Sequence, residues 1–151
     1  MEISDRLARI FAFAMKAMND PASLGMVLTK FDNAEQWDSE GWRFTKYYWE
    51  RVSGIADPPP PKFSGWLRPM GTRLNYWASV STPKNPKAFC EVGATHEDGT
   101  RVDFYFAHDG TLLEVKRTLF SMGFLDARAP SSAEPTEEEL RFVEERLSNW
   151  L

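Results

Sequence analysis

Apolar and polar residues alternate through residues 72–119, and two turn signals interrupt the alternation. Asp-Gly pairs stand at positions 98–99 and 109–110, each between alternating segments. Asp-Gly flanked by alternating apolar residues is typical of a β-hairpin, because both residues tolerate the left-handed backbone of a tight turn. The pattern therefore predicts a four-stranded antiparallel meander over about 72–119.

The first turn fits best as three residues, with Gly99 at the left-handed position. Only this length pairs apolar residues with each other: Ala94 with Val102, Val92 with Phe104, and Cys90 with Phe106. A two-residue turn would instead place Glu91 opposite Phe106. A slip of one residue exchanges the two faces of a strand, so the three-residue turn is favoured.

The second turn is predicted as the two residues Asp109-Gly110. This choice pairs Phe106 with Leu113, pairs Phe104 with Val115, and sets Asp103 opposite Lys116 on the other face. In the first strand of the meander the alternating residues are expected on the apolar side; they are Leu74, Tyr76, Ala78 and Val80.

A first helix is predicted near the N-terminus, with Ser4 as its cap and an end at Asn19-Asp20-Pro21. Its apolar stripe has helical spacing and consists of Ile3, Leu7, Ile10, Phe11, Ala14 and Met18. Residues 22–31 fit either a short helix or a strand.

Residues 32–54 are predicted as a second long helix, or as a short helix followed by a longer one. The apolar stripe that favours a helix is Phe44, Tyr48, Val52 and Ile55, with Gly54 as the stop signal. Residues 57–71 begin with Asp57 and four prolines and contain two glycines, so they are expected to form a stiff extended connector.

The last helix has the strongest start signal in the chain, because Thr136 followed by Glu139 is a capping box. Its expected buried stripe is Leu140, Val143, Leu147 and Trp150, and residues 121–135 before it are expected to form a surface loop. The whole chain, residues 1–151, is predicted as a single α+β domain with the N-terminal helices and the C-terminal helix on one face of the sheet. Its parts are a helical part (1–56), the connector (57–71), the sheet (72–119), and a loop with the last helix (120–151).

Composition narrows the functional classes. The net charge is −4, and no basic stripe for phosphates is present, which argues against nucleic-acid binding. No segment approaches the roughly 20 apolar residues that span a bilayer, so no membrane role is expected. The single cysteine, Cys90, excludes an intrachain disulfide, and together these features favour a cytoplasmic protein.

The residues that most often carry chemistry do not combine into a catalytic or metal site. His96 and His108 stand next to the two turns, at opposite ends of one strand, so they cannot bind one metal ion. Cys90 is expected on the apolar face, where a thiol is a poor nucleophile. No cofactor is indicated, and the chain is interpreted as a binding protein rather than an enzyme.

The polar side of the meander is the candidate partner surface, with large aromatic residues at its margin. Aromatic residues make up 14% of the chain, and such side chains anchor many protein interfaces. The predicted partner-binding residues are Trp66, Trp77, Glu91, Arg101, Asp103, Tyr105, Glu114 and Lys116. The function favoured is docking on another protein, as an immunity protein, antitoxin or phage-type inhibitor does.

Two alternatives remain open. The aromatic residues Trp42, Tyr47 and Trp49 could line a small-molecule pocket between the sheet and the helices, with or without a modest enzymatic activity. A strand at a sheet edge could also pair across a two-fold axis to form a homodimer.

Overall fold

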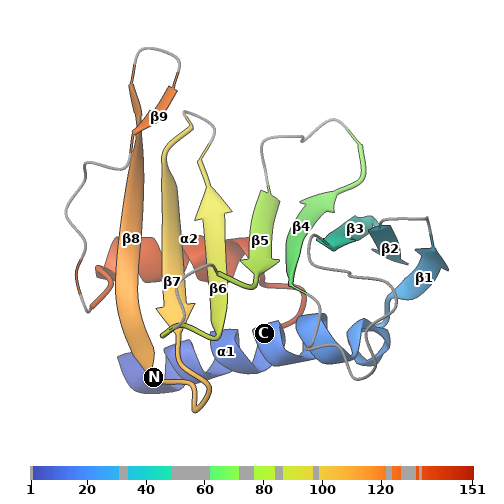
Figure 1. Cartoon of the computed structure of the whole chain (residues 1–151), viewed down its shortest axis with the longest axis horizontal. Coiled ribbons are helices and arrows are strands. Elements are labelled where there is room, and N and C mark those ends of the chain that lie inside the picture. The colour runs from blue at the N-terminus through green and yellow to red at the C-terminus, as the bar shows by residue number, and fades with distance from the viewer. Residues whose placement is uncertain are drawn as a thin grey trace, which may run out of the picture.

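The computed structural model describes residues 2–30, 34–48, 62–71, 77–83, 87–96, 99–121, 124–126, 132 and 134–151. In these residues an antiparallel sheet forms one layer and two α-helices form the other (Figure 1). The helical elements are α1 (Ile3–Asn19), the short 3-10 helix η1 (Pro21–Leu24) and α2 (Glu137–Arg146). The strands are β1 (Val27–Lys30), β2 (Ala34–Ser39), β3 (Trp42–Tyr48), β4 (Phe63–Pro69), β5 (Trp77–Ser81), β6 (Cys90–Thr95), β7 (Arg101–Phe106), β8 (Leu112–Ser121) and β9 (Phe124–Asp126).

The sheet is a meander in which every strand pairs antiparallel with the next one along the chain. Strands β1 to β8 form one continuous sheet, and β9 pairs only with the far end of β8. The prediction of a four-stranded sheet is therefore wrong. Its four strands correspond to β5–β8, and the meander continues on both sides of them.

The predicted helix over residues 32–54 is the largest error. Residues 34–48 instead form the hairpin β2–β3, which turns at Gly41 with a φ of 77°. Phe44 and Tyr48 are four residues apart, a spacing that fits one face of a helix and equally one face of a strand. The stripe therefore could not distinguish the two structures, and Gly41 was the missed turn signal.

The expected connector over 57–71 is wrong in its second half. Residues 63–69 form β4, which lies between β3 and β5 rather than at a sheet edge. Phe63, Gly65 and Leu67 face the core and alternate with more exposed residues. The glycine that argued against a strand is needed here, because a Cβ at Gly65 would lie 2.6 Å from the ring of Phe44. The four prolines lie outside the described residues.

The register around the first turn is confirmed. Val92 pairs with Phe104, and the flanking pairs are Ala94 with Val102 and Cys90 with Phe106. The amide of His96 donates to the carbonyl of Thr100 at 2.8 Å, which continues this register toward the turn. The predicted inward positions of Ala78 and Val80 are also confirmed, whereas Leu74 and Tyr76 lie outside the described residues.

The second turn differs from the prediction by one residue. The amide of Ala107 donates to the carbonyl of Thr111 at 2.9 Å, so the loop contains three residues. Phe106 consequently pairs with Leu112 and not with Leu113, and a bulge after Tyr105 restores the expected register. Beyond the bulge, the predicted pairs Phe104 with Val115 and Asp103 with Lys116 are both present.

Helix α1 occupies the predicted segment but begins at Ile3, with Glu2 and not Ser4 at the cap position. Residues 22–31 combine both expected forms, since η1 is followed by β1. Helix α2 has the predicted capping box: the Glu139 amide donates to the Thr136 hydroxyl, and the Thr136 amide donates to the Glu139 carboxylate. The predicted surface loop over 121–135 is wrong in part, because β8 runs to Ser121 and β9 follows.

Both helices lie against the same face of the sheet, most closely over β5 and β6 (Figure 1). The core between these layers is closely packed. Its largest fully buried side chains include Phe44, Leu67, Phe104 and Phe106 from the sheet, Ile10 from α1, and Leu140 and Leu147 from the α2 segment. The other face of the sheet, called the outer face below, is consequently the one that carries polar side chains.

Candidate binding face of the sheet

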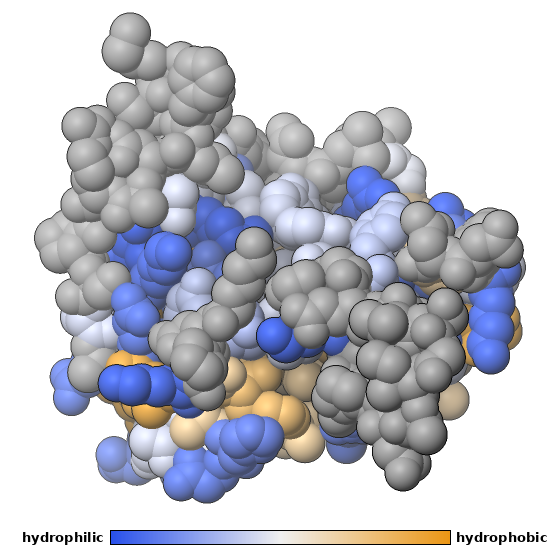
Figure 2. Space-filling model, in the orientation of Figure 1, coloured by the Kyte–Doolittle hydropathy of each residue, from blue (hydrophilic) through white to orange (hydrophobic). Residues whose placement is uncertain are grey.

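All eight predicted partner-binding residues lie on the outer face. Their strands, β4 to β8, are adjacent in the sheet, and each residue occupies a position that alternates with a core residue. Figure 2 views this face and shows mainly hydrophilic residues over the strands, with apolar residues gathered at the lower edge where α1 lies. Trp66 was expected on a connector, but the structure places it on β4, beside the strand of Trp77.

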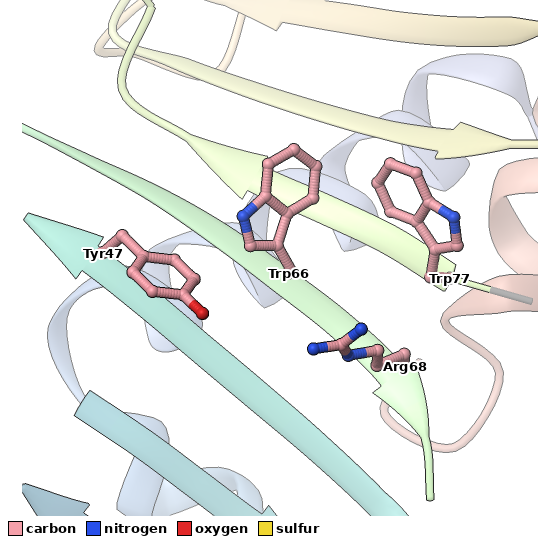
Figure 3. A pocket seen from close by; sticks show the side chains of 4 residues that line it. All are labelled: Tyr47, Trp66, Arg68 and Trp77. Carbon is pink, nitrogen blue, oxygen red and sulfur yellow. The ribbon is translucent and has the colours of Figure 1, made fainter. Parts of the chain in front are cut away.

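The two tryptophans form an aromatic pair. The rings of Trp66 and Trp77 meet edge to face with their centroids 4.9 Å apart, and both residues are half-buried. Together with Tyr47 and Arg68 they line a hollow of about 420 Å³, the first hollow (Figure 3). Tyr47 comes from β3, Trp66 and Arg68 from β4, and Trp77 from β5, so the meander brings them together from three successive strands.

Arg101 is the hub of a polar network next to this aromatic pair. Its guanidinium donates two parallel hydrogen bonds to the carboxylate of Asp103, at 2.8 and 2.7 Å, the bidentate geometry that strengthens such pairs. It also donates to the hydroxyls of Thr95 and Ser79. The same guanidinium lies 5.3 Å from the ring centre of Trp77, within cation–π range. Arg101 is thereby fixed by β5, β6 and β7 together.

Gly93 makes room for the Asp103 carboxylate. These residues are register partners on β6 and β7, and a Cβ at Gly93 would lie 2.0 Å from a carboxylate oxygen of Asp103. Any larger residue would displace this carboxylate, which is almost completely buried. The ion pair of Asp103 with Arg101 therefore depends on the absence of a side chain on the neighbouring strand.

Glu91 lies beside this ion pair without sharing fully in it. The nearest guanidinium nitrogen of Arg101 is 4.0 Å from its carboxylate, compared with 2.7 Å for Asp103. The pKa of the Glu91 carboxyl is raised to about 8, chiefly by burial and also by the charge of Asp103 and a hydrogen bond with it, while the charges of Arg101 and Lys116 act in the opposite direction. Glu91 is therefore a carboxyl group that keeps its proton near neutral pH.

Glu91 and Arg101 line a second hollow of about 370 Å³, which adjoins the first. Both tryptophans of the aromatic pair also line it, and the hydroxyl-bearing residues Ser81 and Thr95 lie at its wall. Within the described residues, Arg101 uses four of its five N–H groups in the bonds to Asp103, Thr95 and Ser79. The second hollow thus combines aromatic walls with a few hydrogen-bonding groups.

The remaining predicted residues extend the face toward β8. Tyr105 lies between Glu91 and Glu114 in register, and Asp103 lies opposite Lys116. Burial raises the pKa of the Tyr105 phenol, and the nearby charges of Glu91, Asp103 and Glu114 raise it further. Tyr105 therefore remains a hydrogen-bond donor throughout the physiological pH range.

The expected aromatic pocket between sheet and helices does not form from its predicted residues. Trp42 faces the core and meets Trp150 edge to face at 5.2 Å, whereas Tyr47 lies on the outer face; Trp49 lies outside the described residues. The helix side does have a hollow of about 220 Å³ at its periphery, lined in part by Met18, Lys46 and Phe63. The Lys46 ammonium in it already donates to the Met18 carbonyl of α1 at 2.9 Å.

Cys90 is buried in the core, and each of the two histidines stacks on a phenylalanine. Burial, with a smaller effect of the Glu91 charge, raises the pKa of the Cys90 thiol to about 12. His96 stacks on Phe142 and His108 on Phe89, near opposite ends of β7. Among the described residues, no group of three or more His, Cys, Asp or Glu side chains could hold a metal ion.

Arg68 and Ser79 belong to the candidate site and were not predicted. Arg68 was missed because residues 57–71 were interpreted as a connector, and Ser79 because its strand was placed by its apolar residues alone. The alternation of Phe63, Gly65 and Leu67 with polar or bulky neighbours was the signal that could have identified β4 and, with it, Arg68.

Comparison of the chain with models of protein families, with characterised proteins and with solved structures finds no match. A search of the described helices for one with the length and apolar character to cross a bilayer also finds none.

Proposed function

We propose that this chain is a cytoplasmic, non-enzymatic binding protein that docks on a partner protein through the outer face of its sheet. The observation that carries the proposal is the aromatic pair Trp66–Trp77, which borders two adjoining hollows and is flanked by the Arg101 network. Binding energy at protein interfaces is concentrated in tryptophan, tyrosine and arginine residues near the centre of the contact. The outer face presents all three residue types together.

The polar network supports a specific interface rather than a general adhesive surface. Asp103 and Ser79 are almost completely buried, and their hydrogen bonds to Arg101 hold that guanidinium in place before any partner arrives. An anchor that is already ordered loses less conformational entropy on binding. The hydrogen bonds therefore prepare Trp77 and Arg101 for contact with a partner.

The test is to identify what the outer face contacts inside cells of the source organism. A photo-reactive phenylalanine derivative in place of Arg68 or Lys116 should cross-link one stoichiometric protein. The same derivative in place of Arg141, which is exposed on α2, should not cross-link it. Recovery of no stoichiometric protein from the outer-face positions in several growth states would contradict the proposal.

The purified partner then allows a quantitative test. Trp66→Ala and Trp77→Ala should each weaken binding about 30-fold, the effect of losing an interface anchor worth about 2 kcal/mol. Val27→Ala removes an apolar side chain that is 71% exposed at the edge strand β1, and it should leave the affinity unchanged. Melting temperatures of all variants separate loss of contact from loss of fold.

A second candidate function is small-molecule binding, favoured by the sizes of the two hollows. Volumes of about 420 and 370 Å³ fall within the range of small-molecule sites, which are mostly apolar with a few fixed polar groups. The sequence analysis placed such a pocket between the sheet and the helices, where Trp42 packs against the core. The two hollows lie instead on the outer face. A thermal-shift screen of metabolites tests it, since a true ligand should stabilise the wild type and not Trp66→Ala.

A further inference from the structure

We infer that the second hollow receives a cationic side chain, a lysine or arginine of the partner, with Glu91 as its counter-ion and the rings of Trp66 and Trp77 as its walls. The inference rests on the proposed docking function for its biological meaning, because it names the chemistry of the partner at that site. Its physical basis is the distribution of charge around the hollow.

The positive charge of Arg101 is already matched. Its guanidinium makes two short hydrogen bonds to Asp103 and lies 4.0 Å from Glu91, so one carboxylate has a full partner and the other does not. Glu91 is also largely buried, with 19% of its side chain exposed. An ionised carboxylate in such a place gains most from a cation that comes with a ligand.

The walls of the hollow suit the same ligand. Trp66 and Trp77 both line it, and a cation over an indole ring is attracted to the negative face of that ring. The long apolar stem of a lysine or arginine can also pack against the indoles while its charged end reaches Glu91. An anionic group would gain little from Arg101, the cation in this lining, because its guanidinium is already paired with Asp103.

Binding of a cation should be coupled to loss of a proton from Glu91. The groups around Glu91 are known on each side: Asp103, Arg101 and Tyr105 on β7, Lys116 on β8 with Glu114 opposite Tyr105, and the hydroxyls of Ser79 and Ser81 on β5. Burial and the Asp103 charge keep the proton on Glu91 near neutral pH. A cation favours the ionised form, so affinity should increase as the pH rises.

The test uses single-side-chain probes and does not require the partner. N-acetyl-lysine methylamide should shift the indole N–H resonances of Trp66 and Trp77 in a saturable way, with resonances assigned from the Trp66→Ala and Trp77→Ala spectra. The affinity should increase about tenfold between about pH 6.5 and 8.5. N-acetyl-norleucine methylamide and N-acetyl-glutamate methylamide, the neutral and anionic probes, should bind at least about fivefold more weakly at the higher pH.

Two charge variants make the test specific. Glu91→Gln should abolish the pH dependence and weaken lysine-probe binding at least about fivefold, whereas Glu138→Gln removes an exposed carboxylate of α2, on the other side of the sheet, and should change neither. Arg68→Glu alters an exposed side chain in the first hollow and should strengthen lysine-probe binding about twofold. Equal binding of the three probes, or lysine-probe binding unchanged by Glu91→Gln, would overturn the inference.

The outcomes separate this inference from the proposed function. If the lysine probe binds as expected but no protein cross-links through the outer face, the docking function fails and the cation site stands. If a protein docks through Trp66 and Trp77 but the lysine probe causes no saturable shift, the inference fails and the docking function stands.

Discussion

Glu91 and Asp103 are acidic residues on neighbouring strands, and both face the outer side of the sheet. The guanidinium of Arg101 lies closer to Asp103 than to Glu91. Arg101 makes bidentate contact with Asp103, while Glu91 is left with its burial and the nearby negative charge. Two carboxylates that share a site cannot both ionise without cost, so one keeps its proton. At the scale of single residues, the outer face therefore holds a carboxyl group with a raised pKa, and the proposed cation would shift its protonation.

The raised pKa of Glu91 makes a prediction about stability. The folded state binds the Glu91 proton more tightly than the unfolded chain does. The stability that this proton contributes to the fold is therefore fully present below about pH 4.5 and is lost as the pH rises toward about 8. Glu91→Gln should therefore gain stability relative to the wild type, by up to about 5 kcal/mol between these pH values. Urea unfolding at several pH values measures the difference.

Glu114→Gln is the matched control for that experiment. It removes a glutamate from the same face, outside the second hollow, and so corrects for the loss of one carboxylate from the protein. Stability curves of the wild type and Glu91→Gln that run parallel from pH 4.5 to 8 would show that Glu91 does not hold its proton in the folded state.

At the scale of elements, the sequence predicts best where turn signals and apolar spacing agree. The register from Cys90 to Phe106 followed from one turn length, because only that length buried the phenylalanines. The same reasoning failed over Trp42–Tyr48, where a spacing of four residues satisfies both a helix and a strand. Long-range pairing with β4 decided the outcome, and that information is absent from any local window of sequence.

The candidate site was predictable to the extent that the sheet was. Seven of its residues, from Trp77 to Lys116, followed from alternation within the predicted meander. Trp66 was chosen as an exposed aromatic residue, but its contact with Trp77 requires β4, which the sequence analysis had interpreted as a connector. The buried state of Asp103 was equally unpredicted, because it depends on Gly93 on the adjacent strand.

Helix α2 provides the element-scale prediction. Thr136 caps the helix through the Glu139 amide, and Thr136→Ala removes this hydrogen bond from an exposed position. We expect the free energy of unfolding to fall by about 1 kcal/mol. Thr136→Ser keeps the capping oxygen and should lose much less. Chemical denaturation measures both variants, and equal losses in the two would rule out the capping contribution.

At the scale of the whole molecule, the two helices are in contact with each other through their side chains, and they cover only part of the sheet. Arg6 of α1 donates hydrogen bonds to Glu137 and Glu144 of α2, so the helical layer is held together by charge as well as by the core. This layer lies over β5 and β6, whereas β1 is a four-residue edge strand with mostly exposed side chains. Stability should consequently decrease from the centre of the sheet toward β1.

Hydrogen exchange followed by mass spectrometry tests this gradient. Amides of β5, β6 and β7 should exchange slowest, because they open only when the core between sheet and helices opens. Amides of β1 should exchange much faster, since a short exposed edge can separate locally. Equal protection of β1 and β6 would mean that the sheet opens as one unit.

The reaction of the Cys90 thiol offers a second way to measure opening of the same core. It is the chain's single cysteine, it is fully buried at the start of β6, and its thiol has a strongly raised pKa. A thiol-specific reagent can therefore reach the sulfur only in molecules whose central strands have come apart. The rate of alkylation therefore measures how often the core opens in the native protein. No label has to be added, and no second thiol in the chain competes for the reagent.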